Sequence, residues 1–173
     1  LFHAEHKIGV KLYVKRVFIM EDSKELVPEY LRFLRGVVDA EDLNLNISRE
    51  ILQQDRQVQA IRKRVVKKVL DALKGLKNND EEKYNAFWRE FGTVLKEGIY
   101  HDPDQRDTLL GLLKAESTAS PDGLVTLAEY KDRMKEGQDK IYFVTADSLQ
   151  AAKTSPHLEF FRKKGIEVLL MGE

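Results

Sequence analysis

A regular alternation of apolar and polar residues lies between positions 8 and 15. Its apolar members are Ile8, Val10, Leu12 and Val14. This period of two predicts a strand with one buried face. Residues 17–20 are all apolar, so we expect the chain to enter a sheet there that helices cover on both faces.

A helix and a short strand are predicted next. Pro28 suits the first turn of a helix, where its missing N–H is not needed, and Gly36 suits the end of one. Val37 and Val38 then form a short return strand. This order of strand, helix and strand is typical of layered α/β structure.

One long helix is predicted from Arg49 to Lys77, because apolar residues recur there at spacings of three and four. They include Ile51, Val58, Ile61, Val65, Val69, Leu73 and Leu76. Unbroken, this helix would be roughly 43 Å long. Its outer face carries Arg62, Lys63, Arg64, Lys67 and Lys68. These cations fit a surface for nucleic acid or an acidic partner, but the zero net charge of the chain favours an ordinary solvated face.

Residues 78–116 have the pattern of a helical insert. Asn79 and Glu82 match a capping box at its start. The helix that follows carries an aromatic stripe, which we assign to packing because such stripes usually lie in cores. Asp102-Pro103-Asp104 marks the start of a third helix, which is rich in leucine.

The last part of the chain alternates strands with helices. Residues 117–123 are small and turn-forming, so they are the best linker candidate. Strands are expected at 124–126, 140–145 and 166–171, with mostly parallel pairing. A helix through Met134 and two short helices separated by Pro156 lie between these strands.

The predicted fold class is therefore α/β, with two layered α/β/α subdomains joined by a long helix and a small helical insert. The first subdomain is incomplete. The predicted divisions are 1–77, with the arginine-bearing loop and long helix, 78–116 for the insert, and 117–173 for the small α/β subdomain.

A single arginine lies at the start of the long helix. Asn46 or Ser48 can cap this helix, and Glu50 favours the positive end of its dipole. Arg49 then falls in the first turn and can reach outward to a phosphate. Gln53 shares its face, at roughly 6 Å between Cβ atoms, so one polar ligand could meet both. Spacing alone favours a capped helix start with a solvated arginine over a catalytic site.

Composition narrows the choices. The chain has 173 residues, with 29 basic and 29 acidic side chains. No long-range field therefore favours nucleic acid or an anionic membrane. There is no cysteine, which excludes disulfides and thiolate metal sites and agrees with a reducing cytosol. No apolar run approaches the roughly 20 residues of a membrane span. The chain begins at Leu1, and we interpret it as a fragment.

Other chemistry is nearly absent from the sequence. It has no phosphate-binding glycine loop of the Walker or dinucleotide type. Its histidines are scattered, and only His3 and His6 have a spacing that a metal could use. We therefore expect no metal site.

Several segments in this order resemble one family. They are residues 11–20 (KLYVKRVFIM), 28–39 (PEYLRFLRGVVD), 46–54 (NISREILQQ), 130–136 (YKDRMKE), 141–145 (IYFVT) and 163–171 (KKGIEVLLM). Together they resemble the middle domain of heat-shock protein 90. Residues 87–92 (FWREFG) and 155–159 (SPHLE) look closest to the bacterial branch, high-temperature protein G.

This resemblance implies an ATP-dependent chaperone in the cytoplasm. In the family, ATP with magnesium is held by a separate N-terminal domain, and the middle domain supplies an arginine to the terminal phosphate. Carried over, Arg49 is the catalytic and nucleotide-contacting residue, and Gln53 acts with it. Asn46 and Ser48 position the loop. The implied partners are the N-terminal ATPase domain, unfolded client proteins and other chaperones, with homodimerisation through a C-terminal domain.

Two alternatives remain open. The chain could be a client or co-chaperone docking module in which Arg49 has no chemical role. It could also be a nucleic-acid binder, which rests only on the basic residues 62–68. We expect neither nucleic acid nor a membrane as a partner, and we expect the isolated chain to be inactive as an ATPase.

Overall fold

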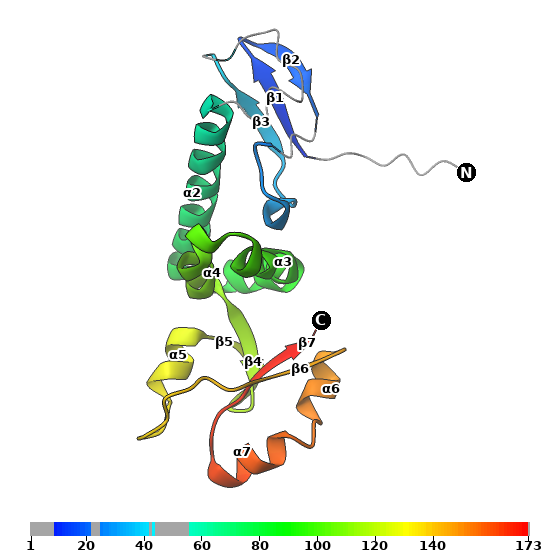
Figure 1. The fold of residues 1–173 in the computed structure, drawn as a ribbon. Coiled ribbons are helices and arrows are strands. Elements are labelled where there is room, and N and C mark those ends of the chain that lie inside the picture. Colours follow the sequence, from blue (N-terminus) through cyan, green and yellow to red (C-terminus); the bar gives the residue numbers. More distant parts are fainter. Residues whose placement is uncertain (1–8, 22–24, 42, 44–55, 173) are drawn as a thin grey trace, which may run out of the picture. The chain divides into compact units, whose positions relative to one another are not determined.

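The computed structural model describes residues 9–21, 25–41, 43 and 56–172. The chain divides into two compact units, residues 1–75 and residues 76–173 (Figure 1). Each unit is described by itself below. The predicted division into 1–77, 78–116 and 117–173 stays a prediction.

Three strands form the sheet described in unit 1. They are β1 (Val10–Val14), β2 (Val17–Met20) and β3 (Gly36–Asp39), in the order β2-β1-β3. β1 pairs antiparallel with β2 and parallel with β3. Leu12 and Val14 are fully buried, which confirms the alternation predicted for the first strand, and β3 confirms the short return strand.

β1 and β2 form a tight hairpin. Val14 pairs with Val17, so only Lys15 and Arg16 lie in the turn, with φ angles of 51° and 67°. Positive φ at both positions is the geometry of a type I′ turn, which matches the twist of the flanking strands. The Arg16 N–H also donates to Asp39 Oδ1 at 3.2 Å. The sequence gives no signal for this turn because neither residue is the usual asparagine or glycine.

The expectation that helices cover residues 17–20 on both faces is wrong. β2 is an edge strand of the described sheet, and Val17 and Phe18 are about half exposed, at 50% and 48%. Tyr13 and Phe18 meet edge to face across the hairpin. An apolar run alone does not distinguish a covered strand from an edge strand that carries apolar residues outward.

The helix predicted between Pro28 and Gly36 is also wrong. The segment contains one 3₁₀ turn, η1 (Glu29–Leu31), with Pro28 in extended conformation before it and Gly36 already in β3. Tyr30 and Leu31 are buried, so packing of these two side chains accounts for the apolar pattern. One 3₁₀ turn is enough to bury both side chains, so no longer helix is required.

The described part of the long helix is α2 (Arg56–Asn79). It ends two residues beyond the predicted Lys77, and the predicted start at Arg49 lies outside the described residues. Its buried residues are Val58, Val66, Leu70 and Leu73. The predicted Val65 and Val69 are half-buried, so the buried stripe is rotated by one residue along this part of the helix.

Unit 2 begins with helices. α3 (Glu81–His101) is capped by Asp80, whose carboxylate accepts from the Lys83 N–H at 3.1 Å, so the predicted cap at Asn79 is wrong. A turn, η2 (Pro103–Gln105), and α4 (Arg106–Leu112) follow it as predicted. The Tyr84 hydroxyl donates to the Leu112 carbonyl at 2.5 Å, and burial raises the pKa of Tyr84.

Four strands form the sheet described in unit 2. They are β4 (Lys114–Ser117), β5 (Ser120–Thr126), β6 (Phe143–Ala146) and β7 (Leu169–Gly172), in the order β5-β4-β7-β6. β4 pairs antiparallel with β5 and β7, and only β6 and β7 are parallel. The expectation of mostly parallel pairing is wrong because β4, which the sequence pattern did not indicate, lies between β5 and β7.

The predicted linker at residues 117–123 is part of the β4–β5 hairpin. Ser117 is fully buried, and its Oγ accepts from the N–H groups of Ala119 and Ser120. The small residues here allow the chain to make a tight hairpin turn, and they do not form a linker between domains. Three helices complete the unit: α5 (Leu127–Asp132), α6 (Leu149–Lys153) and α7 (Leu158–Lys164). The overall class, mixed α/β with two sheets and helices between them, is as predicted.

The aromatic stripe of α3 gives a test of core packing. Tyr84 and Trp88 are buried as predicted, and a Cβ on Gly92 would lie 2.8 Å from the Trp88 ring. Gly92→Ala should destabilise the chain, because overpacking typically costs about 1–3 kcal/mol, whereas alanine gains only about 0.5–1 kcal/mol over glycine in a helix. The measurement is urea unfolding followed by tryptophan fluorescence.

Gly111→Ala is the matched control. Gly111 is exposed in α4, and no atom lies within 4 Å of a Cβ added there. This variant should be slightly more stable than the wild type. Equal effects of the two substitutions would show that the Trp88 contact does not limit residue 92.

Candidate functional site

The residues predicted to carry the chemistry all fall in one short stretch. Asn46, Ser48, Arg49 and Gln53 lie outside the described residues. The structure does describe the residues on both sides of this stretch, namely the end of β3 with Leu43 and the first turns of α2. The candidate site is therefore examined through these two flanks.

The upstream flank is fixed by the sheet. β3 runs parallel to β1 with Leu12 opposite Val38, and the Ala40 N–H continues this pairing by donating to the Tyr13 carbonyl at 2.9 Å. Ala40 is buried, and Leu43 is only 1% exposed. The chain thus leaves the sheet with its last described apolar side chain anchored in the core.

The downstream flank is fixed by the start of α2. Val58 is fully buried, and Ile61 packs against the same core one turn later. Arg62 adds a polar contact, since its Nη1 donates to the Glu25 carbonyl at 3.3 Å. The sequence pattern placed Arg62 on the outer basic face, but this residue is half-buried, unlike Lys63 and Arg64.

Both flanks enter one hydrophobic cluster. Its buried members are Leu12, Val14, Met20, Leu26, Ala40, Leu43 and Val58. Leu43 and Val58, the buried residues on either side of the undescribed stretch, therefore belong to one cluster of unit 1. Burial of one side chain of this size contributes about 1.5–3 kcal/mol to the stability of the folded state, so Leu43 and Val58 each add substantially to the stability of unit 1.

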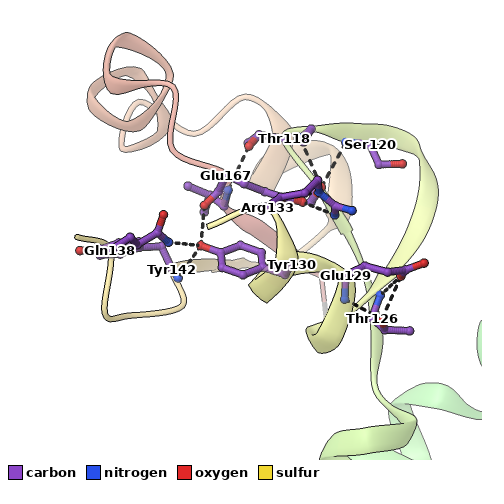
Figure 2. A network of polar contacts seen from close by, with 12 residues as sticks. Thr118, Ser120, Thr126, Glu129, Tyr130, Arg133, Gln138, Tyr142 and Glu167 are labelled. Carbon is purple, nitrogen blue, oxygen red and sulfur yellow. Dashed lines mark hydrogen bonds and ion pairs between the residues drawn. The ribbon is translucent and has the colours of Figure 1, made fainter. Parts of the chain in front are cut away.

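A second group of polar residues lies in unit 2 and was examined as a possible site (Figure 2). At its centre is Tyr130, which is fully buried on α5. Its hydroxyl donates to the Glu167 carbonyl at 2.7 Å and accepts from Gln138 Nε2 at 3.2 Å and from the Tyr142 N–H at 3.0 Å. One hydroxyl therefore joins α5 to the segments that precede β6 and β7.

Glu167 also makes a two-pronged ion pair. Its carboxylate accepts from Arg133 Nε at 2.9 Å and from Arg133 Nη2 at 2.8 Å. Burial of Glu167 disfavours its charged form, but hydrogen bonds from Arg133 and Ser117 outweigh that effect and hold the pKa of Glu167 below its ordinary value. The same pair raises the pKa of Arg133.

The start of α5 is closed by a capping box. Thr126 Oγ1 accepts from the Glu129 N–H at 3.1 Å, and Glu129 Oε2 accepts from the Thr126 N–H at 2.6 Å. The hydrogen bond from the Thr126 N–H is the main reason why the pKa of Glu129 is lowered. These partners satisfy one another, so we assign the Tyr130 group to structure rather than to chemistry.

Sequence reasoning missed the Tyr130 group and the inward contact of Arg62. Tyr130 and Glu167 are 37 residues apart, as are Arg62 and Glu25, so no local spacing indicates either contact. Within the described residues, no group of three or more acidic, histidine or cysteine side chains could hold a metal ion. The same part of the chain contains no helix long and apolar enough to cross a membrane.

Comparison with known proteins fits this architecture. The model of the family described as "Hsp90 protein" matches residues 1–173. The chain belongs to the Hsp90 family. The resemblance noted from the sequence is therefore confirmed over the whole chain, and the mixed α/β fold is that of the Hsp90 middle domain.

Bacterial Hsp90 proteins are close relatives. The chaperone protein HtpG of Nocardia farcinica is 60% identical over 172 residues, which are 99% of this chain and 26% of that protein. The HtpG of Chromobacterium violaceum is 59% identical, over 99% of this chain and 27% of its own. This chain thus spans about a quarter of the length of the curated relatives it matches.

A solved structure gives the same assignment. The middle domain of a Plasmodium falciparum heat shock protein superposes with a TM-score of 0.83 at 34% identity. The match covers 98% of this chain and 64% of that one. These comparisons establish the family and the fold, while the roles of individual residues are proposals.

The Arg133–Glu167 pair gives a prediction for stability against pH. Glu167→Gln should lower the free energy of unfolding by about 1 kcal/mol at pH 7, a value reduced because the Arg133 side chain is 42% exposed. Because the folded-state pKa of Glu167 is lowered, this contribution is present above its ordinary value of 4.5 and is lost as the pH falls through the folded-state pKa.

Urea unfolding of both proteins between pH 7 and pH 3 measures this difference. The gap between wild type and Glu167→Gln should shrink as the pH falls below about 4.5. Glu159→Gln, which removes an exposed ion pair with Lys163, should change stability little at pH 7. A gap between wild type and Glu167→Gln that stays constant down to pH 3 would contradict the role of the charge.

Proposed function

We propose that this chain is the middle-domain part of an ATP-dependent chaperone and that Arg49 acts on ATP held by another domain. ATP, with magnesium, is bound in this proposal by a separate N-terminal domain. The observation that carries the proposal is the shared anchoring of Leu43 and Val58 in one cluster, in a chain of the Hsp90 family. In this proposal, Leu43 and Val58 are the fixed points on either side of the segment with Arg49.

The chemistry proposed for Arg49 is electrostatic. A cation at the terminal phosphate offsets negative charge that develops during phosphoryl transfer, as an arginine finger does. Arginine suits this role because it remains charged and donates through a planar fork, whereas lysine offers a point charge. Gln53 orients Arg49 or the phosphate, and Asn46 and Ser48 hold the loop.

The partners follow from the same proposal. The N-terminal ATPase domain is the first, and unfolded or partly folded client proteins and other chaperones are the others. Homodimerisation through a C-terminal domain and a cytoplasmic location are proposed with them, as the resemblance to the Hsp90 family implies.

The second candidate function is a docking module without a chemical role. It is favoured by the exposed cations of α2, including Lys63, Arg64, Lys67 and Lys68, which would meet an acidic partner. In that case Arg49 would only cap its loop. Nucleic acid fits less well, because the whole chain has no net charge.

The isolated chain should neither bind nor hydrolyse ATP. Its sequence has no phosphate-binding glycine loop, and the proposal places the adenine and sugar contacts in another domain. Calorimetric titration of residues 1–173 with ATP and magnesium checks this. A dissociation constant in the micromolar range would contradict the proposal that ATP is bound by another domain.

Arg49 itself is best tested in a chimera. Here this chain replaces the corresponding segment of the Nocardia farcinica HtpG, to which it is 60% identical. Arg49→Ala should lower ATP turnover about 10- to 1000-fold, the range for loss of one charge-stabilising donor. Arg49→Lys should recover part of the loss, and Gln53→Ala should be milder.

ATP turnover separates the two candidate functions, and nucleotide affinity and melting temperature are the controls. Nucleotide affinity and the melting temperature should change little in these variants, since Arg49 is proposed to act only after domain docking. Near-normal turnover in Arg49→Ala, or a wild-type chimera without turnover, would contradict the catalytic proposal. A large drop in melting temperature would make Arg49 structural.

A further inference from the structure

The strand β6 lies at one edge of the sheet in unit 2. In the strand order β5-β4-β7-β6, one side of β6 pairs parallel with β7. Within the described residues, no strand pairs with its other side. The row of backbone N–H and C=O groups along such an edge can pair with a further strand.

One hydrogen bond shows which backbone groups of β6 point outward. The Tyr142 carbonyl accepts from the Leu169 N–H at 2.9 Å, so this carbonyl turns toward β7. The direction of the backbone groups alternates along a strand, so those of Val144 also turn toward β7. The N–H and C=O groups of Phe143 and Thr145 therefore point to the open side.

The same two residues carry the exposed side chains of β6. Phe143 is 62% exposed and Thr145 is exposed, whereas Val144 and Ala146 are half-buried against the hydrophobic cluster of unit 2. Directly paired residues of neighbouring strands share a face, with Cβ atoms about 4.5–5.5 Å apart. A strand added to this edge would therefore place one of its side chains beside the Phe143 ring.

The opposite edge of the sheet is protected against strand addition. Its strand, β5, contains Pro121, Asp122 and Gly123, residue types that are depleted in strands, and proline has no N–H to donate. β6 contains neither proline nor a charged residue. Because sheets commonly protect their edges with such residues, β6 is the edge of this sheet that is open to pairing.

We propose that the open edge of β6 binds an extended segment of another polypeptide as an added strand. The backbone groups of Phe143 and Thr145 make the hydrogen bonds, and an apolar side chain of the bound segment contacts the Phe143 ring. The bound segment must be free of proline where it pairs. This binding needs neither ATP nor Arg49, so it stands or fails separately from the proposed function.

The probe is a fluorescein-labelled peptide of alternating threonine and valine with a lysine at each end. Its binding to the whole 173-residue chain is measured by fluorescence anisotropy. A dissociation constant below about 1 mM is expected, and the absence of saturable binding in that range would overturn the inference.

N-methylated peptides test the backbone pairing. Methylating the valine nitrogens removes the donors that face β6 when valine lies beside Phe143, so it should weaken binding about 10-fold or more. Methylating the threonine nitrogens changes only the outer side of the added strand and should alter binding less than about threefold. Equal effects of the two modifications would contradict strand addition.

Two pairs of variants locate the site. Phe143→Ser should weaken binding about 10-fold, whereas Phe160→Ser, which removes a ring of α7 that is 57% exposed, should change it less than about twofold. Thr145→Pro removes an outward N–H but none that faces β7, so it should weaken binding about 10-fold, and Thr145→Ala should bind like the wild type.

Thermal unfolding of each variant is the control for folding. If Thr145→Pro unfolds the chain, the comparison of Phe143→Ser with Phe160→Ser decides. Unchanged binding in Phe143→Ser, or equal weakening in both serine variants, would overturn the inference. Sedimentation tests the other occupant of the edge: a wild-type dimer that Phe143→Ser dissociates would show that β6 pairs with a second copy of this chain, which would also overturn it.

Discussion

The hydrophobic cluster of unit 1 is the constraint on which the candidate site depends. It receives side chains from β1, from β2, from the end of β3 and from the first turn described in α2. Leu43 and Val58 are its two members on either side of the Arg49 segment, and neither is more than 1% exposed. The action proposed for Arg49 needs such fixed points, because catalysis by positioning fails when the donor is displaced.

Unit 2 combines a hydrophobic cluster with polar contacts at defined points. The hydroxyl of Tyr130 joins three main-chain or side-chain partners, and Glu167 is held by Arg133. Another polar clip ties β4 to α3, where the buried Lys114 donates to Glu81 at 2.6 Å and to Asn85 at 2.7 Å. Such satisfied networks fix one arrangement of the segments, which apolar contacts alone specify less sharply.

How much could be predicted from the sequence depended on the range of the interaction. The first strand, the helix starting near Pro103 and the packing of Trp88 follow from local periodicity, and the structure agrees with them. The pairing of β4 and the hydrogen bond of Arg62 to Glu25 depend on contacts between residues far apart in the chain, so local patterns do not contain them.

The turn at Lys15 was not predicted, and residues 117–123 were predicted as a linker, for another reason. A type I′ turn usually contains asparagine or glycine, and the turn at Lys15 contains neither. Small residues such as those at 117–123 occur both in linkers and in tight hairpins. The Arg49 site could be proposed from the family resemblance, whereas its spacing alone favoured an ordinary helix start.

A double-mutant cycle on Leu43→Ala and Val58→Ala, measured by urea unfolding, tests the shared anchoring most directly. The shared anchoring predicts an interaction free energy above about 0.5 kcal/mol. Effects that add within about 0.3 kcal/mol would contradict it, and such additivity is expected for the control pair Leu43→Ala and Leu158→Ala, because Leu158 belongs to a separate cluster in unit 2.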